Sequence, residues 1–263
     1  MARRRSGAGG LGWTYIALVL LFLYVPLVPP LASSLAPAGV GEPGPTLRWY
    51  RELWRNPLLV GGIQNSLLIG ALVGVLTPPL ALLAAMAVRE LRPKRLIVLT
   101  MLLPLFVPGV SMGLASAFFF RQLGVTPSLG TITVVHVLWA LPFAFLIILA
   151  VMATFDPVYL EAAYLHGAGR WRAFVDVELP LIRHGVLGAG IFSVILSFNE
   201  TIRTGLVQGP LNTVQTYIWS TFLQVGLSPT LYALMSLLIA LTLALVGALL
   251  VVGGRGAVSP RGE

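Results

Sequence analysis

Residues 156–186 read DPVYLEAAYLHGAGRWRAFVDVELPLIRHGV, and this stretch decides the fold. It is rich in acidic and arginine side chains, which are expensive to place inside a bilayer. The runs on both sides of it are apolar and long enough to cross a membrane. We therefore predict a polar unit, residues 156–185, that stands outside the membrane between two transmembrane helices.

This unit has the sequence of two short helices joined by a bend. Asp156 before Pro157 is typical of a helix start, and Gly167 is typical of a helix end because glycine adopts the left-handed conformation easily. A second helix is predicted over 170–178, and Leu179 closes it because a residue before proline is biased away from helical angles. An exposed helix pair of this kind suits a groove on a partner. The alternative is a solvated loop that only connects two spans.

The same residues resemble a known family signature. The motif Glu161-Ala162-Ala163, then Gly167, then Leu179-Pro180, is similar to the EAA signature of binding-protein-dependent ABC importer permeases. The resemblance implies an all-α integral membrane protein with the six transmembrane helices of the type I ABC importer permease fold. It also implies that the polar unit 156–185, here called the coupling unit, is a coupling-helix unit between helices 4 and 5 that docks on a cytoplasmic ATPase. His166 stands where many relatives have leucine, and the helix cap does not depend on it.

The composition is that of a membrane protein. Hydrophobic residues make up 57% of the 263-residue chain and charged residues only 10%, against about a quarter in soluble domains. The net charge of +8 does not indicate a nucleic-acid partner, because the basic residues lie at the edges of apolar runs rather than on one solvated face. The absence of cysteine excludes disulfides and thiolate chemistry.

The apolar runs predict six spans in a single transmembrane permease domain over 11–252, between tails at 1–10 and 253–263. A signal-peptide core has about 7–15 residues, and the first apolar run, 11–35, is longer. We therefore predict that it is a retained span. Residues 47–52 suit a short helix at the bilayer interface, and Pro104 and Pro108 are expected to bend the third span. The predicted spans are 11–35, 62–88, 96–120, 131–155, 186–207 and 231–252.

The basic residues predict the orientation. Six spans place both termini on one side of the membrane, and the tails, the 89–95 loop and the coupling unit hold twelve of the 17 Lys and Arg residues. The positive-inside rule assigns that side to the cytoplasm. The expected location is the bacterial cytoplasmic (inner) membrane, with several crossings and both termini cytoplasmic.

Small residues recur every four positions in three spans and predict faces that pack against neighbouring helices. These stripes are Gly70, Gly74 and Pro78; Gly185, Ala189, Ser193 and Ser197; and Ser236, Ala240, Ala244 and Ala248.

An ionisable pair near the end of the fifth span is a candidate for lining the translocation path. Glu200 shares the face of Ser197, Arg203 lies one turn further on, and Asn199 stands beside them. An ionisable residue in a membrane is a functional-site hypothesis by default. Two interpretations stay open: the side chains contact the solute, or Glu200 and Arg203 pair with each other and stabilise the bundle. His136 is expected to be a hydrogen-bonded core residue.

Further motifs resemble the spermidine/putrescine-type permease branch, over about residues 11–252. Asn199 departs from the acidic residue that relatives often have, which weakens the attraction for a polycation. The motifs lie at 47–50, 65–67, 104, 108–109, 197–200, 226–229 and 232–234.

The resemblance implies the partners and the function. The chain would be the permease of an ATP-driven, binding-protein-dependent importer for polyamine or a similar small polar solute. A second permease, homologous or identical, two cytoplasmic ATPase subunits and an external solute-binding protein would complete it. The chain has no phosphate-binding glycine loop, so ATP and Mg are expected on partner subunits, with no cofactor or catalytic residue here. The alternatives are an intramembrane enzyme and a non-transporting scaffold.

Overall fold

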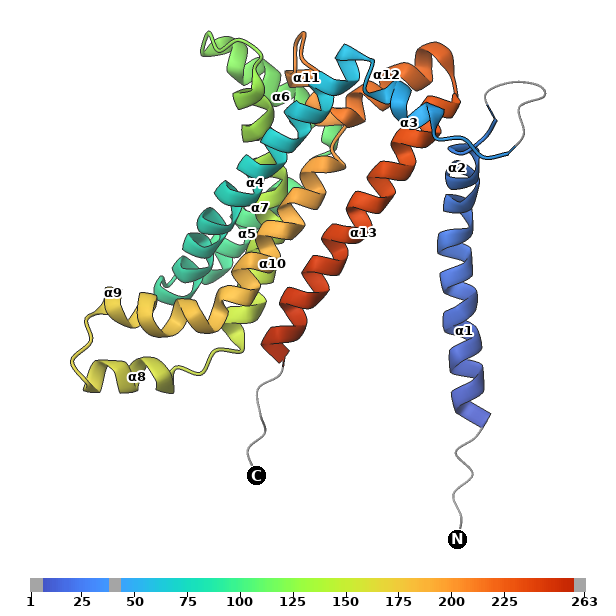
Figure 1. The fold of residues 1–263 in the computed structure, drawn as a ribbon. Coiled ribbons are helices and arrows are strands. Elements are labelled where there is room, and N and C mark those ends of the chain that lie inside the picture. Colours follow the sequence, from blue (N-terminus) through green and yellow to red (C-terminus); the bar gives the residue numbers. More distant parts are fainter. Residues whose placement is uncertain (1–6, 38–43, 258–263) are drawn as a thin grey trace. The chain divides into compact units, whose positions relative to one another are not determined.

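The computed structural model describes residues 7–37 and 44–257, and this part of the chain is helical without strands (Figure 1). The outermost parts of the predicted tails, 1–6 and 258–263, lie outside the described residues, as does 38–43. The helices are α1 (Gly7–Tyr24), η1 (Val25–Leu27), α2 (Val28–Ser33), α3 (Arg48–Leu53), α4 (Pro57–Glu90), α5 (Lys94–Phe106), α6 (Gly109–Gln122), α7 (Leu129–Ala153), α8 (Val158–Leu165), α9 (Arg170–Arg172), η2 (Ala173–Glu178), α10 (Leu179–Phe198), α11 (Ile202–Val207), α12 (Val214–Val225) and α13 (Pro229–Ala257).

The chain divides into two compact units, which are described separately. The first comprises Met1–Asn56 and Thr221–Leu241, and the second comprises Pro57–Ser220 and Thr242–Glu263. The single domain expected over 11–252 stays a prediction.

In the first unit, α3 is held by hydrogen bonds from its aromatic side chains. The Tyr50 hydroxyl lies 2.8 Å from the hydroxyl oxygens of both Ser34 and Ser236, and Trp49 Nε1 donates to the Ala36 carbonyl over 2.7 Å. These bonds satisfy the polar ends of two amphipathic rings. A short helix was expected at 47–52, and α3 at Arg48–Leu53 confirms it.

The described helices include five that are long and apolar enough to cross a membrane, and α5 with α6 makes a sixth if the bent pair counts as one span. The expected six-span fold is therefore present. The bend expected in the third span, 96–120, is confirmed, and it is large enough to divide the span into two helices, because α5 and α6 meet at 101°. Val107 is extended, with ψ 122°, as a residue before proline prefers, and Pro108 is the residue directly before α6.

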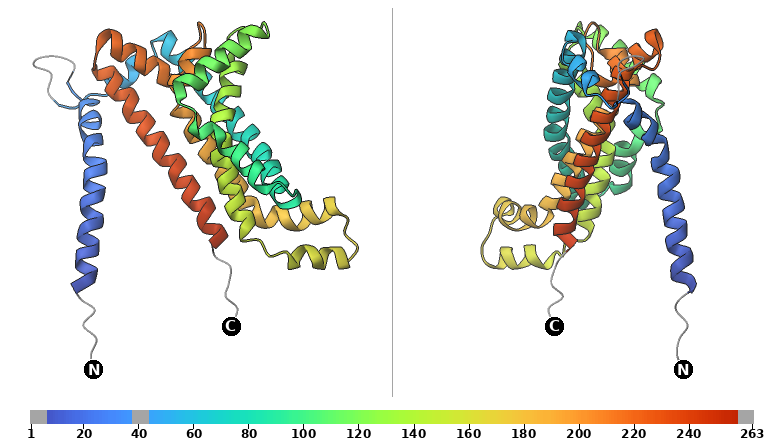
Figure 2. Two further views of the ribbon diagram at one scale, coloured as in Figure 1. Left: turned by 180° about the vertical axis from the view of Figure 1, so that it is seen from behind. Right: turned by 45° about the vertical axis from the view of Figure 1, so that its right-hand side comes forward.

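In the second unit, α4, α7 and α10 lie side by side and form the core (Figures 1 and 2). A Cβ at Gly70 would lie 2.8 Å from the Phe198 ring, and one at Gly74 would lie 2.6 Å from Val194 Cγ2. Glycine is needed here because α4 and α10 approach so closely. The stripes predicted on the second and fifth spans are confirmed as packed faces. Their buried members are Gly70, Pro78, Gly185, Ala189, Ser193 and Ser197.

The stripe predicted on the sixth span is only partly correct. Ser236 is buried, whereas Ala240, Ala244 and Ala248 are exposed. A spacing of small residues indicates a face that allows close approach, but it does not identify the neighbour.

The close contact between α10 and α7 gives a stability prediction. A Cβ at Gly185 would lie 2.6 Å from Val151 Cγ2 and 2.8 Å from Val151 Cβ, which moves only with its backbone. We expect Gly185→Ala to lower the stability of the protein in detergent by about 1–3 kcal/mol, as overpacking does. Gly61→Ala is the matched control, because a Cβ there meets nothing within 4 Å. The fraction that stays monodisperse after heating measures the difference, and equal melting of the two variants would contradict the packing.

Candidate functional site

Helix α8 carries the first part of the signature and has defined ends. Val158 N donates to Asp156 Oδ1 over 2.9 Å, which caps the start. At the end, Gly167 has φ +82° and its N–H donates to the Tyr164 carbonyl over 2.9 Å. The helix start and the glycine end that the sequence predicts are both confirmed. The signature residues Glu161, Ala162 and Gly167 are exposed, and Ala163 is half-buried.

The second helix of the coupling unit does not end at Leu179 as predicted. Leu179 has helical angles, φ −58° and ψ −42°, and α9, η2 and α10 form one continuous apolar helix, Arg170–Phe198. Segment η2 is a π-helix, whose wider turn changes the backbone pattern in front of Pro180. Pro180 follows this turn without breaking the helix. The expectation that the residue before a proline leaves the helix is therefore wrong at Leu179. The second helix is therefore an extension of α10.

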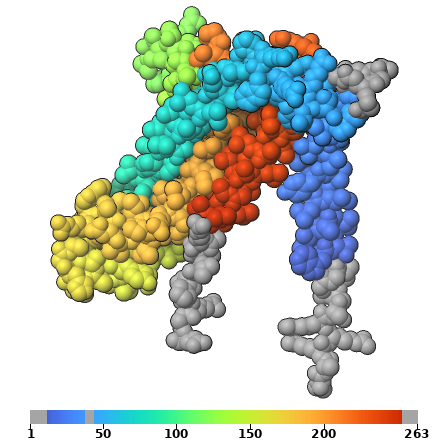
Figure 3. Space-filling view, viewed as in Figure 1, coloured from blue at the N-terminus to red at the C-terminus, as the bar shows by residue number. Residues whose placement is uncertain are grey.

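The coupling unit forms a cleft with the end of α4. The cleft has a volume of about 890 Å³ and lies between α8, the second helix and the last turn of α4. Glu161 and Tyr164 line it from α8, while Leu179 and Pro180 do not. In the space-filling view, the coupling unit (yellow) is not covered by other segments on the side seen (Figure 3). Its other charged and aromatic lining residues are Arg89, Glu90, Arg170, Phe174 and Glu178.

The candidate path residues lie at a break in the fifth span. A continuous span was predicted to Val207, but α10 ends at Phe198 and α11 begins at Ile202. Glu200 lies within this break rather than inside a helix, and it is only 6% exposed. The backbone N–H of Arg203 donates to Glu200 Oε1 over 2.9 Å, and Arg203 Nη1 donates to Glu200 Oε2 over 2.5 Å. The pairing that one interpretation required is therefore present.

Residues from two other helices complete the surroundings of Arg203. Its guanidinium lies 3.9 Å from the centroid of the Trp139 ring, and its Nε lies 3.3 Å from Met112 Sδ. Gly109 and Gly113 of α6 leave room, because a Cβ at either would lie within 3.3 Å of Arg203. Sequence reasoning did not assign these contacts. The Gly109/Gly113 spacing was an available signal, since small residues four apart allow close approach.

His136 joins the two sides of the break. It is 2% exposed, with Nδ1 2.8 Å from Ser197 Oγ and Nε2 2.7 Å from Thr204 Oγ1. Thr204 Oγ1 donates to the Glu200 carbonyl over 2.9 Å. In a neutral ring, Nε2–H therefore donates to Thr204, and Nδ1 accepts from Ser197. The expectation of a hydrogen-bonded core histidine is confirmed.

The other two candidate path residues differ in exposure. Ser197 is 7% exposed and bonded to His136. Asn199 is exposed, and its Nδ2 donates to the Ile195 carbonyl over 2.8 Å. Among the four candidate path residues, Asn199 is therefore the one whose side chain is accessible to a solute. Within the described ranges, no group of three His, Asp or Glu side chains is placed to hold a metal ion.

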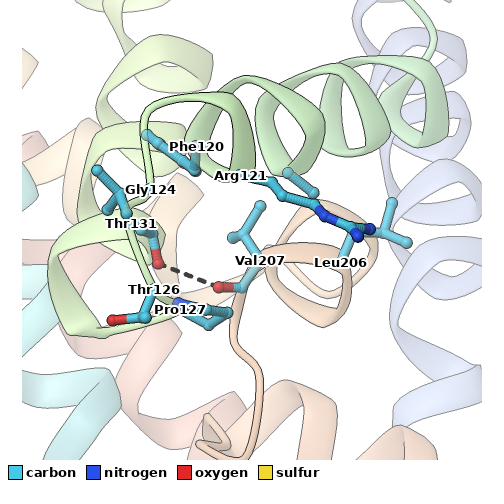
Figure 4. A pocket seen from close by; sticks show the side chains of 10 residues that line it. Phe120, Arg121, Gly124, Thr126, Pro127, Thr131, Leu206 and Val207 are labelled. Atoms are coloured by element: carbon cyan, nitrogen blue, oxygen red, sulfur yellow. Dashed lines mark hydrogen bonds between the residues drawn. The ribbon is translucent and has the colours of Figure 1, made fainter.

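A second cavity lies near the C-terminal end of α6, against the start of α7 and the end of α11 (Figure 4). Its volume is about 380 Å³, and its lining is largely apolar, with Phe120, Pro127 and Leu206. Thr131 Oγ1 donates to the Val207 carbonyl over 3.0 Å beside it, shown as the dashed line in Figure 4. It contains none of the residues that the sequence singles out.

The chain is similar to known transport proteins. Residues 67–258 match the family described as binding-protein-dependent transport system inner membrane component. The spermidine/putrescine transport system permease protein PotC of Escherichia coli (strain K12) is 24% identical over 236 residues, 88% of this chain and 89% of that protein. The trehalose/maltose transport system permease protein MalG of Thermococcus litoralis is 26% identical over 202 residues, 72% of this chain and 71% of that one.

Solved structures share the fold. A chain of a bacterial ABC transporter that imports the acidic polysaccharide alginate has a TM-score of 0.69 at 13% identity, over 94% of this chain and 97% of that one. A chain of an amino acid ABC transporter with histidines has a TM-score of 0.58 at 18% identity, over 80% of this chain and 99% of that one.

Proposed function

The chain belongs to the family of binding-protein-dependent transport system inner membrane components and is a permease subunit of an ABC importer, and we propose that it lines the path of a polyamine or a similar small polar solute. The single observation that carries the assignment is the family match over residues 67–258, which includes the exposed α8 and its glycine cap. This family consists of transport components, which favours a transporter over an intramembrane enzyme or a scaffold.

In the proposed orientation, the coupling unit and both termini face the cytoplasm of a multi-pass inner membrane protein. The ion pair between Arg89 and Glu178 supports this, because it joins the basic 89–95 loop to the coupling unit at one end of α4. Both segments contribute to the inward excess of positive charge.

The proposed partners are two cytoplasmic ATPase subunits, a second permease and an external solute-binding protein. The capped, exposed α8 supports docking in a groove of the ATPase, since a short rigid helix loses little freedom on binding. A structural relative at 18% identity is described as an alginate ABC transporter in complex with a pentasaccharide-bound periplasmic protein. ATP and Mg would bind on the ATPase.

Alternating access is the proposed mechanism. The continuous helix Arg170–Phe198 runs from the coupling unit to the break that holds Glu200, so a displacement of α8 and η2 reaches the path directly. ATP binding shifts the equilibrium between two conformations only through different affinity for them. The residues of the coupling unit transmit this motion and perform no chemistry.

The class of solute is proposed from the relatives, and the geometry of the site indicates how such a solute would bind. The putrescine transport system permease protein PotI of Escherichia coli (strain K12) is also similar, at 24% identity over 240 residues. Glu200 is already paired with Arg203, so a polycation gains from this carboxylate only when the arginine moves away. Ser197, Asn199, Glu200 and Arg203 are the proposed path residues.

Deletion of the gene in its native host tests the solute directly. Uptake of radiolabelled spermidine and putrescine is expected to fall by about tenfold or more and to return with the wild-type gene, while maltose uptake stays unchanged. Loss of maltose uptake alone would overturn the polyamine assignment and leave the permease assignment standing.

A further inference from the structure

Arg89 and Glu178 form an ion pair that crosses from α4 to the coupling unit. Arg89 Nη1 donates to Glu178 Oε1, and Arg89 Nε donates to Glu90 Oε1 over 3.0 Å. The Glu178 side chain is only 2% exposed, whereas that of Arg89 is 36% exposed. The buried carboxylate thus has a charged partner that reaches it from another helix.

The ion pair restricts the arrangement of α4 and η2 more strictly than apolar packing does. A buried carboxylate without a partner is strongly unfavourable, so Glu178 stabilises the one arrangement in which Arg89 reaches it. A charge-assisted hydrogen bond of this kind also depends on direction and distance. The pair therefore defines how the last turn of α4 lies against η2.

A second contact holds the same two helices together further along. A Cβ at Gly190 would lie 3.0 Å from the Gly74 carbonyl, and the Gly74 position itself meets Val194 of α10. Because η2 continues into α10 without a break, α4 and the extended helix are joined at two separated points. A displacement of η2 therefore carries α4 as well as α10.

We propose that Arg89 and Glu178 are positioning residues for coupling, which lock the coupling unit onto α4 so that the motion of the ATPase reaches α4 and α10 together. The inference rests on the proposed function, since it assumes that an ATPase docks on this unit. Without the lock, part of the displacement is absorbed at the junction of η2 with α4. The transporter then hydrolyses ATP while moving less solute.

The test measures how many ATP molecules are hydrolysed for each solute moved. The complex is purified through a tag on this chain, reconstituted in proteoliposomes with its binding protein, and supplied with spermidine, putrescine or maltose. We expect Arg89→Gln and Glu178→Gln to raise this ratio by at least about fivefold, within the usual range of coupling between sites. Arg89→Lys is expected to restore most of the coupling. The ratio does not depend on the amount of active complex, so a merely structural loss of protein does not change it.

Arg92→Gln is the matched control. Arg92 lies in the same basic loop, is exposed and is not among the residues that line the cleft, so the ratio of ATP hydrolysed to solute moved is expected to stay within about twofold of wild type. Assembled Arg89→Gln and Glu178→Gln complexes with wild-type ratios overturn the inference and leave the proposed function intact. If either single variant fails to assemble, the exchanged pair Arg89→Glu with Glu178→Arg decides: recovered assembly and coupling support the lock, and no recovery contradicts it. A wild-type complex that moves none of the three probes overturns the proposed function and the inference with it.

Discussion

Gly167→Pro is expected to release the ATPase from the complex and abolish transport. Gly167 has φ +82°, whereas proline is fixed near about −65°, so the bend between α8 and the second helix cannot form. Proline also removes the N–H that donates to the Tyr164 carbonyl. We expect co-purification of the ATPase to fall by about 100-fold, because a displaced helix no longer fits its groove.

A graded series separates the bend from a general effect of substitution. Gly167→Ala has open space around its Cβ but keeps the positive φ, at a strain of about 1–2 kcal/mol, so a partial loss is expected. Gly169→Ala is the control, because Gly169 has φ −71° and a Cβ there meets nothing within 4 Å. It should bind the ATPase normally.

Glu161→Arg tests the surface of α8 rather than its geometry. Glu161 is exposed, so reversing its charge leaves the fold intact and changes only what a partner meets. We expect co-purification of the ATPase to be lost here too. Normal binding and transport by both Glu161→Arg and Gly167→Pro would show that this unit is not the coupling site.

Arg203→Gln is expected to destabilise the protein by about 3–5 kcal/mol, because it leaves the buried Glu200 carboxylate without its charged partner. Glu200→Gln has a smaller effect on folding, since Arg203 keeps its contacts with Trp139 and Met112. The double Gln variant should recover much of the stability lost by Arg203→Gln. Thermal unfolding in detergent measures all three, with the exposed Arg121→Gln as control.

Transport by the same variants separates the two interpretations of the pair. If Glu200 contacts the solute, Glu200→Gln lowers uptake by about tenfold while the complex stays assembled. Unchanged uptake would leave the pair a purely structural role.

Several features of the fold follow from local sequence and were predictable. Asp156 and Gly167 cap α8 through contacts with their own neighbours in the chain, so the sequence contains the whole cause. The stripe that includes Ser193 and Ser197 was predictable because small residues four apart line one face of a helix.

Other features depend on contacts between distant residues and could not be predicted. Pro180 looked like a helix end, but the helix continues through it, and the π-helical η2 directly before it has no signal in the sequence. The local sequence does not indicate that Glu178 is buried, because its burial goes with its ion pair to Arg89, which is far away in the sequence. The break at Glu200 is held by His136 and Trp139 of α7, so no pattern within the fifth span reveals it.

Cross-linking from α8 tests the central claim, that a separate cytoplasmic ATPase moves this permease through the coupling unit. The chain has no cysteine, so Leu165→Cys supplies a single thiol, at a position that is 88% exposed. A benzophenone maleimide attached there and irradiated in membranes is predicted to join the permease to the ATPase in one adduct. Absence of that adduct, together with labelling of the thiol in intact cells by a membrane-impermeant reagent from outside, would contradict the account.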